Sequence, residues 1–128
     1  MKTMLSETIH CMSPLLVVSD LGQSLKFYTE QLGFAINFRH GDFYAGIGLG
    51  THSIHHKAGD PCSSERLRRR KNEDVDLIFG VKDLDGMYEH VCSRAMEIVQ
   101  PLRVMPYGRE FYIGDPDGYV LAFFDVTS

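Results

Sequence analysis

Three of the six histidines, His52, His55 and His56, lie within a stretch of five residues. Imidazole binds transition metals and transfers protons near neutral pH, so such a cluster could hold a metal ion or supply a general acid. Alternate residues of a strand share a face, which would place His52 and His56 on the side of Ile54 and turn His55 away. A metal site needs a further ligand, and Asp76 is the candidate. The other interpretation is that these histidines border a polar pocket.

Two carboxylates and a tyrosine are the other candidates for chemistry. Asp76 interrupts the apolar, strand-like run "VDLIF". A carboxylate that faces a cavity can bind a cationic ligand or, with its pKa raised by burial, act as a base. A hydrogen-bonded structural Asp at the strand entrance is the alternative. Glu110 and Tyr112 precede a "DPDG" turn, and both face the cavity if Phe111 packs under a helix.

Two helices must hold these strands in place. Asp20 is a candidate N-cap. Apolar residues follow it at spacings of four, three and four from Leu21 to Leu32, which predicts a helix of about three turns. The same arrangement returns 63 residues later, with Asp83 as the cap and apolar residues from Leu84 onward.

An internal repeat of this kind fixes the architecture. Each copy reads as strand, helix and three strands, which predicts an α+β fold of two βαβββ modules in a single domain, residues 1–128. We expect module one at about residues 12–58, a polar linker at about 59–73 and module two at about 74–126. Because one helix covers one face of each sheet, the modules should form a cupped mixed sheet with the helices on its outer face. Such a cup is a common type of ligand site.

The composition excludes several classes of protein. The chain has 128 residues, 44% hydrophobic and 23% charged, and its net charge of −4 is unlike that of a basic nucleic-acid-binding domain. No apolar run reaches the roughly 18 residues of a membrane span, and the first residues lack the apolar core of a signal peptide. Cys11, Cys62 and Cys92 are odd in number and irregularly spaced, as free thiols are. We expect a cytoplasmic protein without a nucleic-acid or membrane partner.

The linker contains a basic run, "RLRRRK", from Arg66 to Lys71. Such a run could contact phosphate or an acidic partner. In an acidic chain we expect it to be a solvated, mobile loop instead, and the sequence assigns it no role.

Three longer stretches carry a resemblance: "PLLVVSDLGQSLKFYTEQLGF", "DVDLIFGVKDLDGMYEHV" and "PYGREFYIGDPDGYVLAFFD". They cover most of the chain from Pro14 to Asp125. In this order they resemble the vicinal-oxygen-chelate superfamily, also called the glyoxalase, bleomycin-resistance and extradiol-dioxygenase superfamily. The resemblance implies paired βαβββ modules and, usually, a homodimer.

The metal enzymes of that superfamily carry ligands on the first and last strand of each module. The resemblance places the corresponding positions of this chain at Ser13, Ile54, Asp76 and Ala122. Only Asp76 is a good ligand for a divalent metal, and a lone carboxylate cannot replace the three protein ligands of a typical catalytic site. The chain therefore resembles the metal-free, bleomycin-resistance-like branch, whose members sequester a drug at a dimer interface. We expect no metal and no cofactor.

We therefore predict a metal-independent small-molecule binding protein of the drug- or antibiotic-binding kind, without catalytic residues. Its pocket would be formed by His52, His56, Asp76, Glu110, Tyr112 and Phe124, the last of which shares the face of Ala122. An acid-rich wall favours a cationic or hydrogen-donating ligand, and open apolar sheet faces favour a homodimer. The alternative is an isomerase or lyase of the same superfamily with a non-standard site, using a carboxylate (Asp76 or Glu110) as base and a histidine (His52 or His56) as acid.

Overall fold

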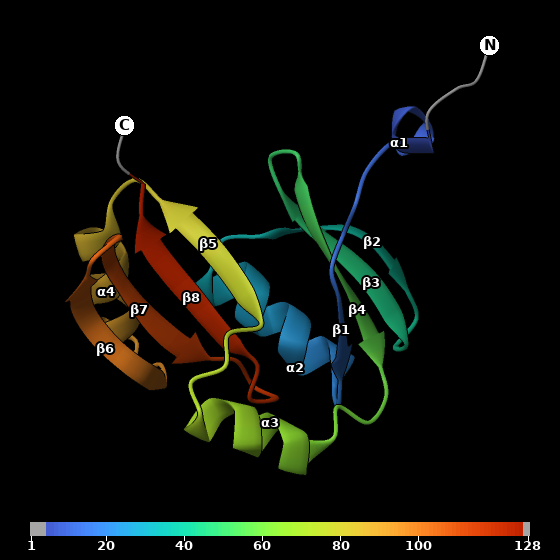
Figure 1. Ribbon diagram of the computed structural model, residues 1–128. Coiled ribbons are helices and arrows are strands. Elements are labelled where there is room, and N and C mark those ends of the chain that lie inside the picture. The colour runs from blue at the N-terminus through green and yellow to red at the C-terminus, as the bar shows by residue number, and fades with distance from the viewer. Residues whose placement is uncertain (1–4, 127–128) are drawn as a thin grey trace. The chain divides into compact units, whose positions relative to one another are not determined.

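The computed structural model describes residues 5–126, which form two compact units divided after residue 60. Each unit holds one four-stranded sheet (Figure 1). The elements of unit 1 are α1 (Leu5–Thr8), β1 (Leu15–Val18), α2 (Leu21–Lys26) with a π-helical turn η1 (Phe27–Gln31), β2 (Ala35–His40), β3 (Tyr44–Leu49) and β4 (His52–Ala58). Those of unit 2 are α3 (Ser63–Lys71), β5 (Leu77–Val81), α4 (Leu84–Ser93), β6 (Ile98–Met105), β7 (Gly108–Gly114) and β8 (Val120–Asp125).

The two sheets have the same topology. The strand orders are β1-β4-β3-β2 and β5-β8-β7-β6. In each sheet the first and last strands pair in parallel and the other pairs are antiparallel. Strand, helix and three strands therefore occur twice, which confirms the predicted α+β fold of βαβββ modules.

Both predicted helix caps are confirmed. The Asp20 side chain accepts a hydrogen bond from the backbone N–H of Gln23 at 2.9 Å, and Asp83 accepts one from the N–H of Gly86 at 3.0 Å. These bonds satisfy N–H groups that the first helical turn leaves without a partner. The first helix differs from the prediction in one respect: after Lys26 it widens into η1 and does not continue as a regular α-helix.

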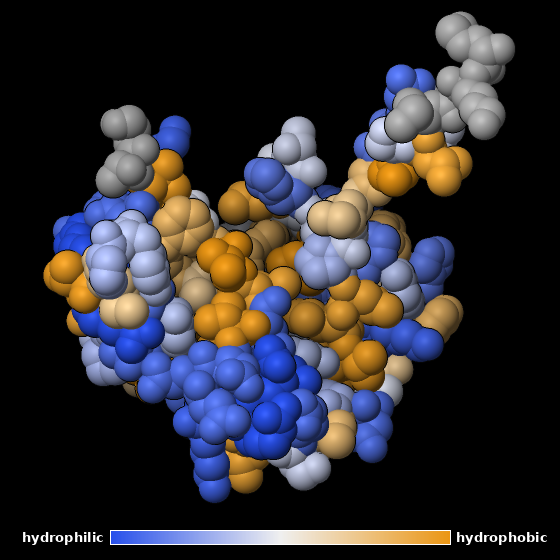
Figure 2. All heavy atoms as spheres, in the orientation of Figure 1, coloured by the Kyte–Doolittle hydropathy of each residue, from blue (hydrophilic) through white to orange (hydrophobic). Residues whose placement is uncertain are grey.

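The linker prediction was wrong for the basic run. Ser63–Lys71 forms the helix α3, and Figure 2 shows a hydrophilic surface over it. No apolar face marks this helix in the sequence, but arginine is a good helix former, and Glu65 pairs with Arg68 one turn later at 2.5 Å. Further arginines pair with carboxylates outside the helix, so the segment is not a free loop.

The helix α4 covers one face of the sheet of unit 2. In unit 2 the rings of Tyr88 (α4) and Phe111 (β7) lie 5.0 Å apart, and Phe111 stacks on Phe123 (β8) at 5.2 Å. Odd-numbered residues of β7 therefore pack under α4, and Glu110 and Tyr112 lie on the opposite, open face. No helix among residues 5–126 is long and apolar enough to cross a membrane.

Candidate functional site

A hollow of about 350 Å³ lies on the open face of unit 2. Its floor is an apolar cluster in which Tyr112 and Ala122 are buried and Val75 packs against them. The lining residues are Val75, Ile78, Tyr107, Glu110, Tyr112, Ala122 and Phe124. Three predicted pocket residues, Glu110, Tyr112 and Phe124, thus come together around Ala122.

Glu110 is the hydrogen-bonding centre of this hollow, and only 5% of it is exposed. Its Oε2 accepts hydrogen bonds from Arg103 Nε and Nη2, at 2.9 and 2.6 Å, and from the Tyr112 hydroxyl at 2.9 Å. Its Oε1 accepts one from the Tyr107 hydroxyl at 2.7 Å. The Arg103 guanidinium also lies over the Tyr112 ring, 5.3 Å from its centre, and 3.6 Å from Glu73.

These bonds decide the protonation state of the three acidic groups. Burial alone would raise the pKa of Glu110, but hydrogen bonds from Tyr107, Arg103 and Tyr112 outweigh it, so the pKa lies below its ordinary value of 4.5. Burial and the bond to Glu110 raise the pKa of Tyr112, and the bond to Glu110 raises that of Tyr107. At neutral pH the centre is one carboxylate held by two neutral hydroxyls and one guanidinium.

Sequence reasoning missed Arg103 and Tyr107. Arg103 on β6 lies directly opposite Glu110 on β7, so opposite charges form a cross-strand pair. A hairpin between "PLRVM" and "GREFY" would have placed them together, since Tyr107 is in its turn. The register is regular from the turn to this pair, and the shifts lie beyond it, between Ile98 and Arg103.

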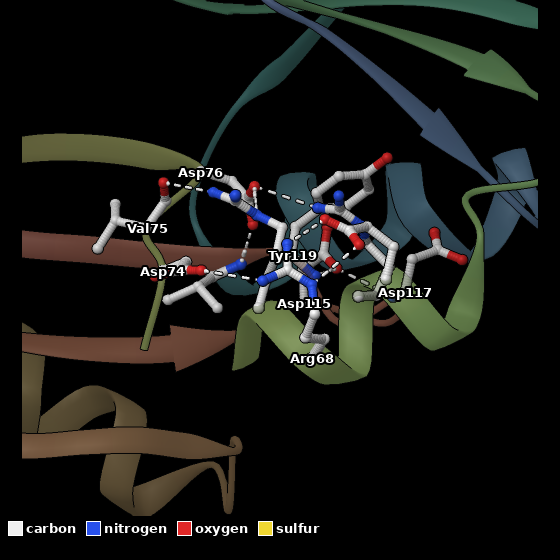
Figure 3. A network of polar contacts seen from close by, with 11 residues as sticks. Arg68, Asp74, Val75, Asp76, Asp115, Asp117 and Tyr119 are labelled. Carbon is white, nitrogen blue, oxygen red and sulfur yellow. Dashed lines mark hydrogen bonds and ion pairs between the residues drawn. The ribbon is translucent and has the colours of Figure 1, made fainter. Parts of the chain in front are cut away.

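Asp76 does not line the hollow. Its Oδ1 accepts hydrogen bonds from Arg66 Nη1 at 3.1 Å and Arg69 Nε at 3.0 Å, both from α3, and its Oδ2 accepts the backbone N–H of Val120 at 2.8 Å. The Arg66 guanidinium also covers the Tyr119 ring at 4.4 Å. Figure 3 shows Asp76 and Tyr119 within this network of charged groups. The arrangement favours a hydrogen-bonded structural Asp at the strand entrance.

The predicted orientation of the histidines was wrong. His56 is fully buried and packs edge-on against Tyr28 of η1 at 4.9 Å between ring centres, so it lies on the helix side of its sheet. Ile54, two residues earlier, is buried on the same side. His52 is exposed at the start of β4. His55 is the histidine on the open face.

Strand pairing explains the error. Leu15 pairs with His55 in unit 1, and its repeat equivalent Ile78 pairs with Ala122 in unit 2. The counterpart of Ala122 is therefore His55 and not Ile54. Counting from the preceding glycines failed because His55 follows Gly50 by five residues, whereas Ala122 follows Gly118 by four.

The open face of unit 1 carries an aromatic cluster, Phe38, Tyr44 and His55. The Tyr44 hydroxyl and His55 Nδ1 are 2.7 Å apart. The Phe38 ring meets the His55 ring edge-on at 5.3 Å, and Phe38 and Tyr44 are nearly parallel at 6.1 Å. Beside the cluster, the hydroxyls of Ser13 and Ser53 bond to each other.

The groups at the superfamily's metal-ligand positions do not fit a metal ion. Ser13 is bonded to Ser53, Nδ1 of His55 is bonded to the Tyr44 hydroxyl, and Ala122 has no donor atom. Both oxygens of Asp76 are taken by α3 and Val120. Among residues 5–126, no group of three or more His, Cys, Asp or Glu side chains is arranged to hold a metal.

The sequence as a whole matches a family model. The model describes the glyoxalase/bleomycin resistance protein/dioxygenase superfamily and matches residues 8–123. The chain belongs to this superfamily. No curated protein is similar to it in sequence at a significant level.

Solved structures share its fold at low sequence identity. FosX, a fosfomycin resistance protein from Listeria monocytogenes, superposes with a TM-score of 0.70 at 16% identity, over 93% of this chain and 94% of that one. The bleomycin-binding protein of Streptomyces verticillus, in complex with copper(II)-bleomycin, gives 0.64 at 22% over 93% and 99%. A lactoylglutathione lyase from Agrobacterium tumefaciens gives 0.70 at 16% over 90% and 92%. At these identities the likeness shows the fold alone.

Proposed function

We propose that this member of the superfamily is a metal-independent small-molecule binding protein, and that the hollow of unit 2 is a ligand site. The observation that carries the proposal is the lining around Ala122. It is an apolar depression whose polar groups are bonded to one another at one edge. Its volume of about 350 Å³ lies at the lower end of the range for small-molecule sites. A few oriented polar groups in an apolar wall are typical of a binding site.

The hydrogen-bonding pattern defines the ligand. Tyr107 and Tyr112 both donate their hydroxyl protons to Glu110, so a ligand can only donate to their oxygens. The Tyr112 oxygen also accepts a hydrogen bond from Arg103 Nη2 at 3.3 Å. Oε1 of Glu110 accepts one bond among the described residues, from Tyr107, and has room for a second donor. The hollow thus offers acceptors and a carboxylate. It suits a cationic or hydrogen-donating group attached to an apolar body.

The same groups are poorly suited to acid–base catalysis. A general base needs a pKa near the working pH, whereas hydrogen bonds lower that of Glu110. Two of the arginines of α3, Arg66 and Arg69, pair with Asp76, and His56 is packed against Tyr28. An isomerase or lyase with these residues as base and acid is therefore the weaker proposal.

Two of the proteins with a similar fold are associated with drugs. One was solved in complex with copper(II)-bleomycin, and the other is a fosfomycin resistance protein. They support a drug- or antibiotic-binding role as a proposal for this chain.

The test uses one probe of the expected chemistry, 2-naphthylmethylamine, a protonated amine on a planar apolar body. Calorimetric titration is done on protein purified with a chelator. We expect binding to wild type and its loss in Ala122→Phe, which fills the floor of the hollow. Val104→Phe is the matched control, because Val104 is 79% exposed on the same sheet and does not line the hollow.

Equal binding to both variants would overturn the assignment of the hollow, as would no binding to wild type. Thermal unfolding of each variant shows whether it is folded. Native mass spectrometry of freshly purified protein adds an independent measurement, since a co-purifying small molecule displaced by the amine would support the same site.

A further inference from the structure

The open face of unit 1 carries a cluster of three aromatic rings. Three rings from three strands meet there: Phe38 on β2, Tyr44 on β3 and His55 on β4. The imidazole stands nearly perpendicular to both other rings, at 87° to Phe38 and 82° to Tyr44. Phe38 is 37% exposed, so part of its ring is open to a ligand. The cluster is defined by residues of unit 1 alone.

Gly46 allows this contact. It pairs with Phe38 on one side and with His55 on the other, so it lies between them on the sheet. A Cβ on Gly46 would overlap the Phe38 ring. The absence of a side chain lets the phenyl ring lie across the strand and reach the imidazole, and a glycine in a strand often marks such a close approach.

The hydrogen bond between Tyr44 and His55 sets the direction of the imidazole. When a hydroxyl donates to Nδ1 of a neutral imidazole, the proton resides on Nε2. Nε2–H is then the one hydrogen-bond donor that the ring can offer to a ligand. Lys57, two residues later on the same strand face, adds a positive charge.

We propose that the Phe38–Tyr44–His55 cluster is a binding site for a planar aromatic group bearing a hydrogen-bond acceptor, such as a carbonyl or carboxylate oxygen. Phe38 supplies an apolar ring for stacking, and Nε2–H of His55 donates to the acceptor. Tyr44 is a positioning residue that acts through the imidazole. The preference is opposite to that of the hollow in unit 2, and the proposal does not depend on what that hollow binds.

The first experiment needs no ligand. Nitrogen-15 chemical shifts of histidine side chains distinguish an Nε2–H from an Nδ1–H tautomer. We expect His55 to be the Nε2–H tautomer in wild type and a mixture in Tyr44→Phe. Tyr88→Phe is the matched control, because it removes a phenol hydroxyl on α4, in unit 2. An Nδ1–H tautomer in wild type, or no change in Tyr44→Phe, would overturn the proposal.

The second experiment is an NMR titration with 2-naphthoate, the carboxylate counterpart of the amine probe. We expect shifts centred on Phe38 and His55 and weaker binding of the amine at these residues. Tyr44→Phe and Phe38→Leu should each lower the affinity for 2-naphthoate about 3- to 10-fold, the loss expected for one hydrogen bond or one ring contact. Gly46→Ala should weaken it comparably by displacing Phe38, whereas the control Gly22→Ala meets only an ordinary contact.

The outcomes separate this proposal from the proposed function. Shifts by 2-naphthoate at Phe38 and His55 that persist in Ala122→Phe support the cluster, whatever the amine does. Shifts confined to the residues that line the hollow, or no shifts at millimolar 2-naphthoate, would overturn the proposal for the cluster. The titration with the amine would still test the proposal for the hollow. Equal weakening by Gly22→Ala and Gly46→Ala would also count against it.

Discussion

Asp76 and Val120 are joined by two hydrogen bonds. The N–H of Asp76 donates to the Val120 carbonyl at 2.8 Å, and the Asp76 carboxylate accepts the N–H of Val120 at 2.8 Å. Asp76 thus extends the pairing of β5 and β8 by one residue before the start of β5. Arg66 and Arg69 of α3 bind the other oxygen. A residue at a superfamily ligand position serves here to fasten α3 to the sheet of unit 2.

The first prediction concerns Asp76→Ala. The change leaves two largely buried guanidinium groups and one backbone N–H without their acceptor, and we expect a loss of about 2–4 kcal/mol in the free energy of unfolding. Urea denaturation at neutral pH measures it. Asp74→Ala is the control, because Asp74 is 40% exposed and 4.0 Å from Arg68, and should cost no more than about 0.5 kcal/mol. A similar, small loss in both variants would contradict the structural role.

The second prediction follows from the lowered pKa of Glu110. A carboxyl whose pKa is lower in the folded than in the unfolded chain binds fewer protons when folded. Its contribution to stability is complete at pH values above the ordinary pKa of 4.5 and is lost as the pH falls through the folded value. Glu110→Gln should therefore cost about 1–3 kcal/mol at pH 7 and progressively less in acid.

Urea unfolding of wild type and Glu110→Gln between pH 7 and pH 3 is the measurement. Arg103→Met removes one of the groups that lower the pKa of Glu110. The loss of stability caused by Glu110→Gln should therefore depend less on pH when both proteins also carry Arg103→Met. A difference that stays constant or grows as the pH falls would be inconsistent with the hydrogen-bonded carboxylate.

The third prediction is a homodimer at micromolar concentration. Ile78 and Tyr107 at the hollow are each 69% exposed, and unit 1 exposes Leu15 and Ile36 by 51% and 47%. Large exposed apolar residues on sheet faces commonly mark an interface. Sedimentation analysis should give twice the chain mass of 14.5 kDa. A single species near 14.5 kDa across the micromolar range would refute the dimer.

The sequence predicted the fold because its signals are local and repeated. Asp20 and Asp83 each precede an amphipathic stretch, and both cap helices. Val18 and Val81, 63 residues apart, end equivalent strands that pair in parallel with the last strand of their sheets. Caps and apolar spacing are properties of a few neighbouring residues, so a single chain displays them directly.

The strand faces of the candidate residues were predicted in part, and the errors have physical causes. The face of Glu110, Tyr112 and Phe124 was right because strand alternation from Phe111 holds through β7 and across to β8. The face of His56 was wrong because the turn before β4 differs by one residue from the turn before β8, and one residue reverses every side chain of a strand.

The helix α3 could not be predicted from apolar periodicity. Its arginines form ion pairs, both within the helix and to residues outside it such as Asp76. Arg70 pairs with Glu97, 27 residues further along the chain. Contacts over such separations depend on the folded sheet, so the sequence shows a basic run and not its partners.

The last prediction is that the protein retains no stoichiometric divalent metal. Zn²⁺ and related ions need several nitrogen, sulfur or oxygen donors free to converge. Ala122 supplies none, Ser13 is bonded to Ser53, and the oxygens of Asp76 are bound by two arginines and a backbone N–H. His55 retains Nε2 alone, since Nδ1 is bonded to Tyr44. Elemental analysis of untagged, dialysed protein should find Zn, Ni, Fe and Mn each far below one per chain, and a chelator should leave the melting temperature unchanged. One metal ion per chain that survives dialysis would contradict this prediction. It would show that these donors rearrange and that the chain is a metal-dependent member of its superfamily.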